Sequence, residues 1–269
     1  MKAQGKTFVI TGGGNGMGRE MTILLLKKGA RVAIIDVSEK AMKETADLAA
    51  GNANRLSTHL VDITNKTEVE KLPEEIIRIH GSVDGLINNA GIIQPFVKVN
   101  ALAYSDIERV LNINLYGLIY MTKSFLPHLL KRPEAHIVNV SSMGGFLPVP
   151  GQSIYGASKA AVKLLTEGLR SELLDTNVKV TIVFPGAIGT NIAANSGLKL
   201  PASSSDQAKS FNPLAPSKAA EIIIDGMEAD EYRVLVGSDA KFMDFIYRLH
   251  PKFAAEFIYK KMKSLLNNA

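Results

Sequence analysis

The chain has 269 residues, of which 46% are hydrophobic and 21% are charged, a balance typical of a globular protein with a sizeable core. This composition excludes the disordered and fibrous classes. No cysteine is present, which excludes disulfides, thiol nucleophiles and thiolate metal sites. No run approaches the roughly 18 apolar residues of a membrane span, and we expect a cytoplasmic protein.

The net charge of +5 is concentrated near the C-terminal end of the sequence. Residues 241–269 contain six Lys or Arg and only two Asp or Glu, so the rest of the chain is nearly neutral. A basic face for nucleic acid is therefore not expected on the body of the protein.

Seven short runs rich in β-branched residues alternate with helical patterns along the chain. Several runs, such as residues 32–35, are continuously apolar, as expected of parallel strands covered on both faces. The pattern predicts one doubly wound, Rossmann-like α/β domain over residues 1–269 with a seven-stranded parallel sheet. The expected strands are residues 7–11, 31–35, 56–61, 83–88, 135–141, 178–184 and 232–236.

A glycine-rich loop, residues 11–18, joins the first strand to a helical stretch. Glycines at such a turn let the backbone approach a pyrophosphate while the amides at the helix N-terminus face its charge. Gly12, Gly16 and Gly18 have a different spacing from the G-x-G-x-x-G fingerprint, and the loop lacks the Lys-Ser/Thr of a P-loop. A flexible turn without ligand is the alternative interpretation.

An acidic residue, Asp36, closes the second strand, 18 residues after Gly18. A carboxylate at this place can accept both hydroxyls of an adenosine ribose. A 2′-phosphate at about 4 Å would cost on the order of 4 kcal/mol at an effective dielectric constant near 20, which favours NAD over NADP. Two alternatives remain: Asp36 caps the next helix, and Arg19 or Lys40 neutralises a phosphate.

Polar residues follow two further strands. Residues 88–91, Asn-Asn-Ala-Gly, end the fourth strand, and Ser142 follows the fifth. Because ligands bind beyond the carboxyl ends of the strands in open α/β sheets, we expect both segments to face the same crevice as the glycine loop. Asn114 lies in a predicted helical stretch, residues 106–130, where a buried amide needs a partner. A turn-forming role for Ser142 and an internal hydrogen bond for Asn114 are the structural alternatives.

Tyr155 and Lys159 are four residues apart near the start of a predicted helix and share one of its faces. Acid/base work near neutral pH requires that the pKa of the phenol fall by about three, which corresponds to about 4 kcal/mol. We expect the neighbouring ammonium to supply this stabilisation. The alternative is an ordinary exposed pair.

Two segments depart from the strand and helix alternation. Residues 190–216 contain three prolines and a serine run, and their length predicts a substrate lid. Residues 239–269 carry aromatic and basic residues at helical spacing, which predicts a basic amphipathic tail of one or two helices, broken at Pro251.

Together these motifs resemble those of the classical short-chain dehydrogenase/reductase family from about Gly5 to Gly237. The motifs are T-G-x-x-x-G-x-G at 11–18, Asp62, N-N-A-G at 88–91, Asn114, Ser142, Y-x-x-x-K at 155–159 and P-G-A-I-G-T at 185–190. The resemblance implies a catalytic tetrad of Asn114, Ser142, Tyr155 and Lys159. In such enzymes the tyrosine exchanges a proton with the substrate oxygen, the lysine holds the nicotinamide ribose, the serine orients the carbonyl and the asparagine supports a relay water.

The resemblance also implies a set of cofactor-binding residues and the partners of the protein. Related enzymes commonly form homodimers or homotetramers, and small residues from Gly156 to Ala161 would permit close helix packing. The five histidines show no ligand spacing, so no metal is expected. The implied cofactor-binding residues are Gly12, Asn15, Gly16, Met17, Gly18, Asp36, Asp62, Ile63, Asn89, Ala90, Gly91, Tyr155, Lys159, Pro185, Gly186, Ile188 and Thr190.

The sequence therefore predicts an NAD-dependent oxidoreductase that acts on an apolar secondary alcohol or ketone, with NADP the less favoured cofactor. Residues 146–149 are expected to line the substrate pocket. An NADPH-dependent ketone reductase and a non-catalytic nucleotide-binding protein of the same fold are the alternatives. For the tail, we favour packing on the body or on a second subunit over contact with a membrane surface. The segment after the last strand also differs from that of many fatty-acyl reductases of the family.

Overall fold

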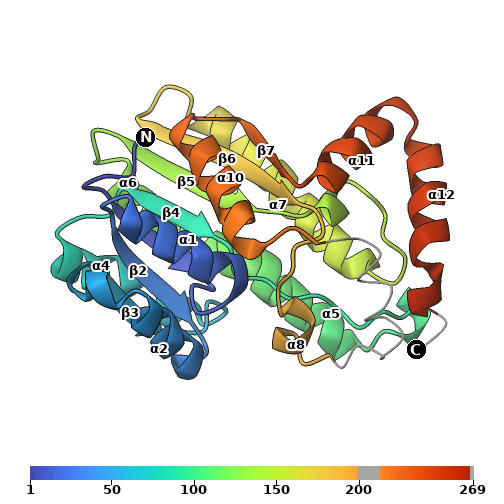
Figure 1. The fold of residues 1–269 in the computed structure, drawn as a ribbon, viewed down its shortest axis with the longest axis horizontal. Helices are drawn as coiled ribbons and strands as arrows, with labels where there is room; N and C mark the ends of the chain where they lie inside the picture. Colours follow the sequence, from blue (N-terminus) through green and yellow to red (C-terminus); the bar gives the residue numbers. More distant parts are fainter. Residues whose placement is uncertain (199–212, 267–269) are drawn as a thin grey trace.

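The computed structural model describes residues 1–198 and 213–266, and its centre is a seven-stranded sheet (Figure 1). All neighbouring strands are parallel, and their order is β3-β2-β1-β4-β5-β6-β7. This confirms the predicted fold class. The strands are β1 (Thr7–Thr11), β2 (Arg31–Asp36), β3 (Leu56–Leu60), β4 (Gly85–Asn88), β5 (Ala135–Val140), β6 (Val178–Pro185) and β7 (Arg233–Val236).

Helices cover both faces of the sheet. Figure 1 shows α1 and α10 side by side on one face, while α4 and α6 pack on the other. The helices are α1 (Gly16–Lys27), α2 (Glu39–Leu48), α3 (Lys66–Val69), α4 (Leu72–His80), α5 (Tyr104–Leu111), α6 (Leu118–Leu129), α7 (Ser153–Glu172), α8 (Ile192–Asn195), α10 (Pro216–Glu228), α11 (Ser238–Leu249) and α12 (Pro251–Met262). Short 3-10 turns are η1 (Ala50–Arg55), η2 (Val99–Ala101), η4 (Met143–Gly145) and η5 (Lys263–Leu266).

The continuous apolar runs reflect burial on both faces of the central strands. Along β1, Phe8 and Ile10 enter the core beneath α1 and α10, whereas Val9 enters the core beneath α4 and α6. Because successive side chains in a strand point to opposite faces, a strand between two helical layers needs apolar residues at every position.

The direction of the strand order reverses at β1, which lies between β2 and β4. The chain builds β2 and β3 on one side of β1 and then returns to β4 on the other side. At such a switch point the loops that follow the two neighbouring strands diverge and leave a crevice beyond their carboxyl ends. The loops here are the glycine loop and residues 88–91, as the sequence predicts.

The C-terminal segment forms α11 and α12, which lie beyond the β7 edge of the sheet (Figure 1). Pro251 begins α12, where a proline costs no helical hydrogen bond, and His250 separates the two helices. Much of the predicted lid, residues 199–212, lies outside the described residues. Within the described residues, no helix combines the length and apolarity needed to cross a bilayer.

A buried histidine in β5 makes the stability of this fold sensitive to acid. His136 is fully buried, and its Nε2 lies 2.9 Å from Thr181 Oγ1. Burial lowers the pKa of His136 to about 3. Because the unfolded chain binds a proton near pH 6.5 and the folded chain does not, this stability is complete above pH 6.5 and is lost as the pH falls towards 3.

We expect His136→Gln, which keeps a hydrogen-bonding side chain but cannot titrate, to reduce this acid sensitivity. Between pH 7 and about pH 4 the free energy of unfolding of the wild type should fall by on the order of 3 kcal/mol more than that of the variant. Urea unfolding at both pH values measures this difference. Parallel pH profiles for the two proteins would contradict the prediction.

Candidate active site

The glycine loop forms a cradle at the N-terminus of α1. The Asn15 side chain accepts a hydrogen bond from Gly16 N at 2.7 Å and caps the helix. The first turn of α1 contains no acidic residue. The helix N-terminus and the positive end of its dipole suit an anionic group such as a pyrophosphate.

Glycine is required at several positions of this cradle. Gly12 and Gly16 have φ values of +67° and +52°, which disfavour residues with a Cβ. A Cβ on Gly18 would overlap the Gly12 carbonyl oxygen. The loop therefore folds tightly onto the start of α1, and the lack of a side chain at Gly18 allows this close packing.

Thr11 and Asn89 tie the cradle to the end of β4. Thr11 Oγ1 accepts hydrogen bonds from Asn89 N and Ala90 N, both at 3.0 Å. In return Asn89 Nδ2 donates to Thr11 O at 3.0 Å and to Gly12 O at 3.3 Å. These bonds hold the two loops of the switch point together.

The two loops line a cavity of about 530 Å³, here called the glycine-loop groove. Most of the predicted cofactor-binding residues meet in it. They are Gly12, Asn15, Gly16, Met17, Asp36, Asp62, Ile63, Asn89, Ala90, Gly91 and Thr190. The glycine cradle, the helix N-terminus and this volume fit an extended dinucleotide.

The predicted turn after β6 is placed differently. The described residues that line the groove do not include Pro185, Gly186 or Ile188. Gly186 lies against the Asp239 carboxylate, which accepts a hydrogen bond from Ala187 N at 2.7 Å, and Ile188 forms a β-bridge with Leu214. In the chain alone this turn therefore anchors the start of α11 and the entry to α10.

Asp36 lies at the end of β2 with its carboxylate beside the glycine loop. It accepts hydrogen bonds from Gly14 N and Ser38 N, both at 3.0 Å. The cap of α2 is Ser38, whose hydroxyl accepts from Ala41 N at 3.2 Å. Asp36 is therefore not the helix cap, and it lines the groove.

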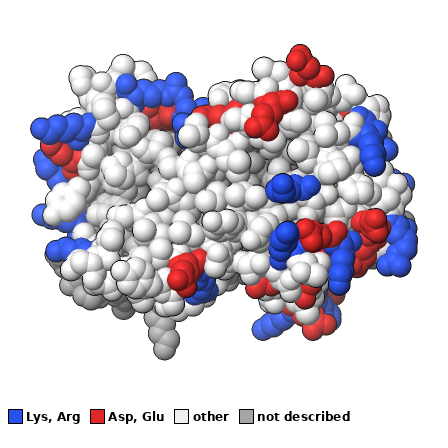
Figure 2. All heavy atoms as spheres, turned by 180° about the vertical axis from the view of Figure 1, so that it is seen from behind, with Lys and Arg blue, Asp and Glu red and all other residues white. Residues whose placement is uncertain are grey.

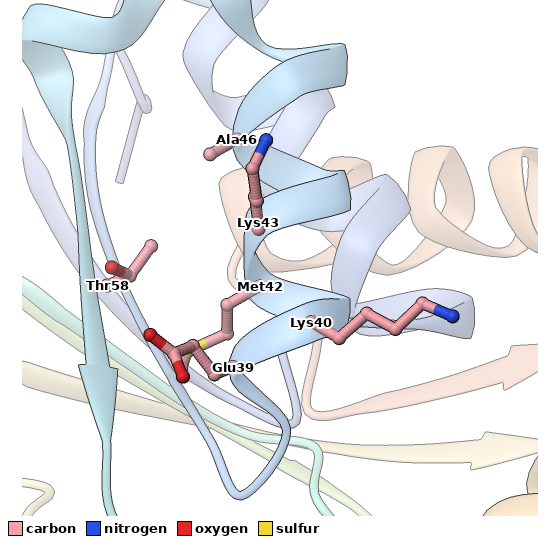
Figure 3. Close-up of a pocket in the computed structure, with 6 residues that line it drawn as sticks. All are labelled: Glu39, Lys40, Met42, Lys43, Ala46 and Thr58. Atoms are coloured by element: carbon pink, nitrogen blue, oxygen red, sulfur yellow. The ribbon is translucent and has the colours of Figure 1, made fainter.

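Of the two cations that could neutralise a phosphate beside Asp36, Arg19 is hydrogen-bonded to other groups. Arg19 donates from Nη2 to Gly14 O at 2.7 Å and to Glu44 Oε2 at 2.8 Å. Figure 3 shows Lys40 pointing away from Thr58 and the other residues of a surface hollow between α2 and β3. Glu39 and Met42 also line this hollow.

Two hydroxyls form the chemical end of the site. Ser142, between β5 and η4, accepts a hydrogen bond from Gly144 N at 3.0 Å, and its hydroxyl is hydrogen-bonded to that of Tyr155 on α7. A Cβ on Gly144 would lie 3.3 Å from Tyr155 Cε1 and 3.5 Å from Ser142 Oγ. The absence of a side chain at Gly144 keeps this pair accessible to a neighbouring group.

Lys159 connects the hydroxyl pair to the groove. Its side chain is buried, its Nζ donates to Val140 O at 3.0 Å, and burial lowers its pKa to about 8. A Cβ on Gly91 would lie 3.1 Å from Lys159 Nζ and 3.2 Å from Asn114 Oδ1. Lys159 and Asn114 therefore converge on Gly91, which itself lines the glycine-loop groove.

The expected lowering of the Tyr155 pKa is wrong for the chain alone. Burial raises the pKa of Tyr155, and the hydrogen bond with Ser142 opposes this shift only in part. Lys159 is not among the groups that shift it. The shared helix face places the two groups near each other but does not by itself make the phenol acidic.

Asn114 lies in a π-helical turn, η3 (Asn112–Gly117), between α5 and α6. The predicted continuous helix over residues 106–130 is interrupted there. The Asn114 amide exchanges two hydrogen bonds with the Ile92 backbone, both at 2.9 Å, and donates to Ser158 Oγ at 3.0 Å. Such π turns often occur at functional sites, where an extra residue in the turn reorients the side chains.

Two positioning residues were missed in the sequence. Gln94 Oε1 accepts from Ile154 N at 2.8 Å and Tyr155 N at 2.9 Å, so it caps the N-terminus of α7. Ser158 receives the Asn114 amide, as described above. Ser158 directly precedes Lys159 in the Y-x-x-x-K motif, which could have drawn attention to it. Gln94 lies in a loop without a periodic pattern, so nothing in the local sequence indicates its role.

No cluster of His, Cys, Asp or Glu that could hold a metal occurs within residues 1–198 and 213–266. The remaining chemistry of the site is thus that of a buried lysine, a phenol and a serine beside a dinucleotide-sized groove.

The chain belongs to the short chain dehydrogenase family, whose sequence profile matches residues 6–200. It is 36% identical over 255 residues to SadH of Mycobacterium tuberculosis, with 91% of each chain covered. It is 32% identical over 241 residues to the 3-oxoacyl-[acyl-carrier-protein] reductase FabG of Thermotoga maritima, covering 88% of this chain and 96% of FabG. The predicted family is confirmed.

Solved structures show the same fold. A short chain dehydrogenase/reductase from Burkholderia phymatum in complex with NAD has a TM-score of 0.82 at 24% identity, with 93% of this chain and 96% of that one covered. A short chain dehydrogenase from Burkholderia cenocepacia in complex with NADP has a TM-score of 0.80 at 24% identity, with 96% and 99% covered. The fold thus accommodates either nicotinamide dinucleotide.

We expect the buried ammonium of Lys159 to reduce stability at neutral pH. Its folded pKa of about 8 lies below the value near 10.4 of the unfolded chain, so the unfolded state binds more protons between these values and stability rises with pH across this window. Lys159→Met should therefore be more stable than the wild type at pH 7, by on the order of 3 kcal/mol, and this advantage should shrink towards pH 10.

Urea unfolding of both proteins at pH 7 and pH 10 measures this difference. Lys163→Met, which removes a partly exposed lysine one turn further along α7, is the matched control. A Lys159→Met variant that is less stable at pH 7, or whose advantage does not change with pH, would contradict the assigned cause.

Proposed function

We propose that the chain is an NAD-dependent oxidoreductase that interconverts an apolar secondary alcohol and its ketone. One observation carries this proposal: Lys159 Nζ and Asn114 Oδ1 converge on Gly91, and Gly91 lines the groove. Tyr155 lies on α7 together with Lys159, and Ser142 lies at the start of η4, which packs on α7. The groove and the hydroxyl pair would therefore serve one reaction.

Each residue of the tetrad has a role that follows from its surroundings. Ser142 orients the substrate oxygen by a hydrogen bond, and Tyr155 exchanges a proton with that oxygen. Lys159 supplies a positive charge beside the groove, and Asn114 fixes the backbone of residues 91–93 against α7. The nicotinamide, when bound, supplies the hydride carrier, and the protein supplies position and charge.

Asp36 and Arg19 support the preference for NAD. The Asp36 carboxylate lines the groove, where it can accept the hydroxyls of a ribose and would repel a 2′-phosphate. Arg19 donates to Gly14 O and to Glu44, whose carboxylate offsets part of its charge.

The substrate side of the hydroxyl pair is apolar. Phe146 and Val149 pack against α11 and α12, and Leu147 is buried in the same cluster. Leu147 was expected to line the pocket, but only 1% of it is exposed, so it supports the wall instead. An apolar substrate fits this surrounding.

A second copy of the chain is proposed as the partner of α7. Ala157 and Ala160 are exposed on this helix, and Leu164 is 69% exposed on the same helix. Small exposed residues allow close approach of another helix. An NADPH-dependent ketone reductase and a non-catalytic protein of this fold remain the alternatives, and the complete tetrad disfavours the latter.

We expect Tyr155→Phe to lower kcat by about a hundredfold or more, because it removes the proton donor and keeps the ring. The assay uses NAD with a panel of steroid, acetoin-like and medium-chain alcohols, and NADH binding is followed by fluorescence to show that the groove is intact. Tyr104→Phe, at an 84% exposed position on α5, is the matched control. A Tyr155→Phe variant as active as the wild type would refute the assignment.

We expect Asp36→Asn to shift the ratio of NADP to NAD affinity by about tenfold or more towards NADP, because it removes a charge beside the site of the 2′-phosphate. Fluorescence titration with both reduced cofactors measures the ratio. Glu39→Gln, a neighbouring carboxylate in the hollow of Figure 3, is the control and should leave the ratio unchanged. Equal shifts in the two variants would mean that overall charge, not Asp36, sets the preference.

A further inference from the structure

The two C-terminal helices have an apolar face that packs on the body and a second apolar face that does not. Met243 of α11 and Ala254 and Ile258 of α12 are buried in a cluster with Leu147. This agrees with the prediction that the tail packs on the body. Burial of these residues accounts for one face of each helix only.

The outer face of α11 carries a stripe of exposed apolar side chains. Phe242, Phe245 and Leu249, spaced as on one side of a helix, are 53%, 61% and 58% exposed. Phe253 of α12, which is 56% exposed, extends the stripe. A helix of a globular protein normally presents polar residues on the side away from the core, so this stripe requires an explanation.

The stripe is continuous between the two helices. The ring centroids of Phe242 and Phe257 are 6.5 Å apart, and those of Phe253 and Phe257 are 6.3 Å apart. Aromatic side chains at these distances form one surface rather than isolated contacts. We call the surface formed by Phe242, Phe245, Leu249, Phe253 and Phe257 the aromatic face.

Most of the exposed charged residues on α11 and α12 are cations. Within residues 238–263 the exposed acidic residue is Glu256, because Asp244 is buried in an ion pair with Arg233 and Asp239 is half-buried. Figure 2, seen from behind, shows Lys and Arg along the edge of the molecule where this helix pair lies. The exposed lysines are Lys241, Lys252, Lys260, Lys261 and Lys263.

The exposed aromatic side chains and the cations together indicate which kind of partner binds the aromatic face. A symmetric contact with a second copy would place the same cations of both chains against each other, which opposes association. A surface that is apolar inside and negatively charged at its boundary complements both properties. An anionic lipid bilayer has this structure, since acyl chains accept aromatic side chains and the headgroups attract lysines at about 1 kcal/mol each.

We propose that α11 and α12 dock the enzyme on an anionic lipid surface through the aromatic face. The docking is peripheral: the helices lie in the interface and do not cross the bilayer. The inner sides of the same helices pack against Phe146 and Val149. The proposal concerns binding only and does not depend on the proposed reaction.

Vesicle flotation with the full chain tests this proposal. Vesicles of phosphatidylcholine alone are compared with vesicles of phosphatidylcholine and phosphatidylglycerol in a two-to-one ratio. The wild type should float with the anionic vesicles and stay in solution with the neutral ones. High salt should weaken the binding because it screens the lysines.

Two sets of variants separate the apolar and the charged contributions. Phe242→Ser with Phe245→Ser and Phe253→Ser should lower the partition coefficient by about tenfold or more. Its matched control replaces equally exposed apolar residues elsewhere, Leu48→Ser with Ile79→Ser and Tyr104→Ser, and should bind like the wild type. Lys252→Glu with Lys260→Glu should also lower binding about tenfold, while Lys123→Glu with Lys131→Glu should not.

Thermal unfolding and NADH binding show that the variants fold. Failure of the wild type to float with anionic vesicles would overturn the proposal, as would wild-type binding by both sets of tail variants. If the aromatic variants change the oligomeric state in solution and the wild type does not float, the face joins copies of the chain and the proposal is wrong. If the aromatic variants fail to fold, the lysine variants and the salt dependence decide the question.

Discussion

The hydrogen bonds that fix residues 91–94 are the constraint on which the site depends. This segment leaves the end of β4, passes the groove at Gly91 and reaches the start of α7 at Gln94. Asn114 holds Ile92 through two bonds, and the Gln94 side chain holds the first amides of α7. Because these groups are buried, an unpaired partner would cost roughly 1–3 kcal/mol, so the arrangement resists local movement. The cofactor end and the chemical end are thereby held in one geometry.

This arrangement buries a positive charge, which destabilises the folded protein. Lys159 donates to the Val140 carbonyl at the end of β5, and burial lowers its pKa to about 8, so most of it remains charged at neutral pH. The apolar layers around the sheet supply the stability that tolerates this charge. Burial also raises the pKa of Tyr155, so the proton exchange proposed for this phenol requires stabilisation by groups beyond the chain alone. A positively charged nicotinamide near the phenol would act in this direction.

Most of the fold could be predicted from the sequence, because both-face burial leaves continuous apolar runs such as residues 32–35 and the glycine loop marks the first turn. The residues of the groove could also be predicted from the sequence, since the carboxyl ends of β1 and β4 must meet at the switch point. Other features could not be predicted. The π turn at Asn114 and the cap from Gln94 depend on contacts between distant segments, and the pKa of Tyr155 depends on burial that a helix face does not reveal. The exposed aromatic face of the tail could not be predicted from the sequence. α11 is apolar on more than one side, and only the structure shows which side is exposed.

A crystal structure with bound NAD tests most directly whether the groove and the hydroxyl pair form one site. The account predicts the adenosine ribose within hydrogen-bonding distance of the Asp36 carboxylate, the pyrophosphate at the N-terminus of α1, and the nicotinamide ribose in contact with Tyr155 and Lys159. A dinucleotide bound elsewhere, or a nicotinamide that points away from Tyr155 and Ser142, would contradict it.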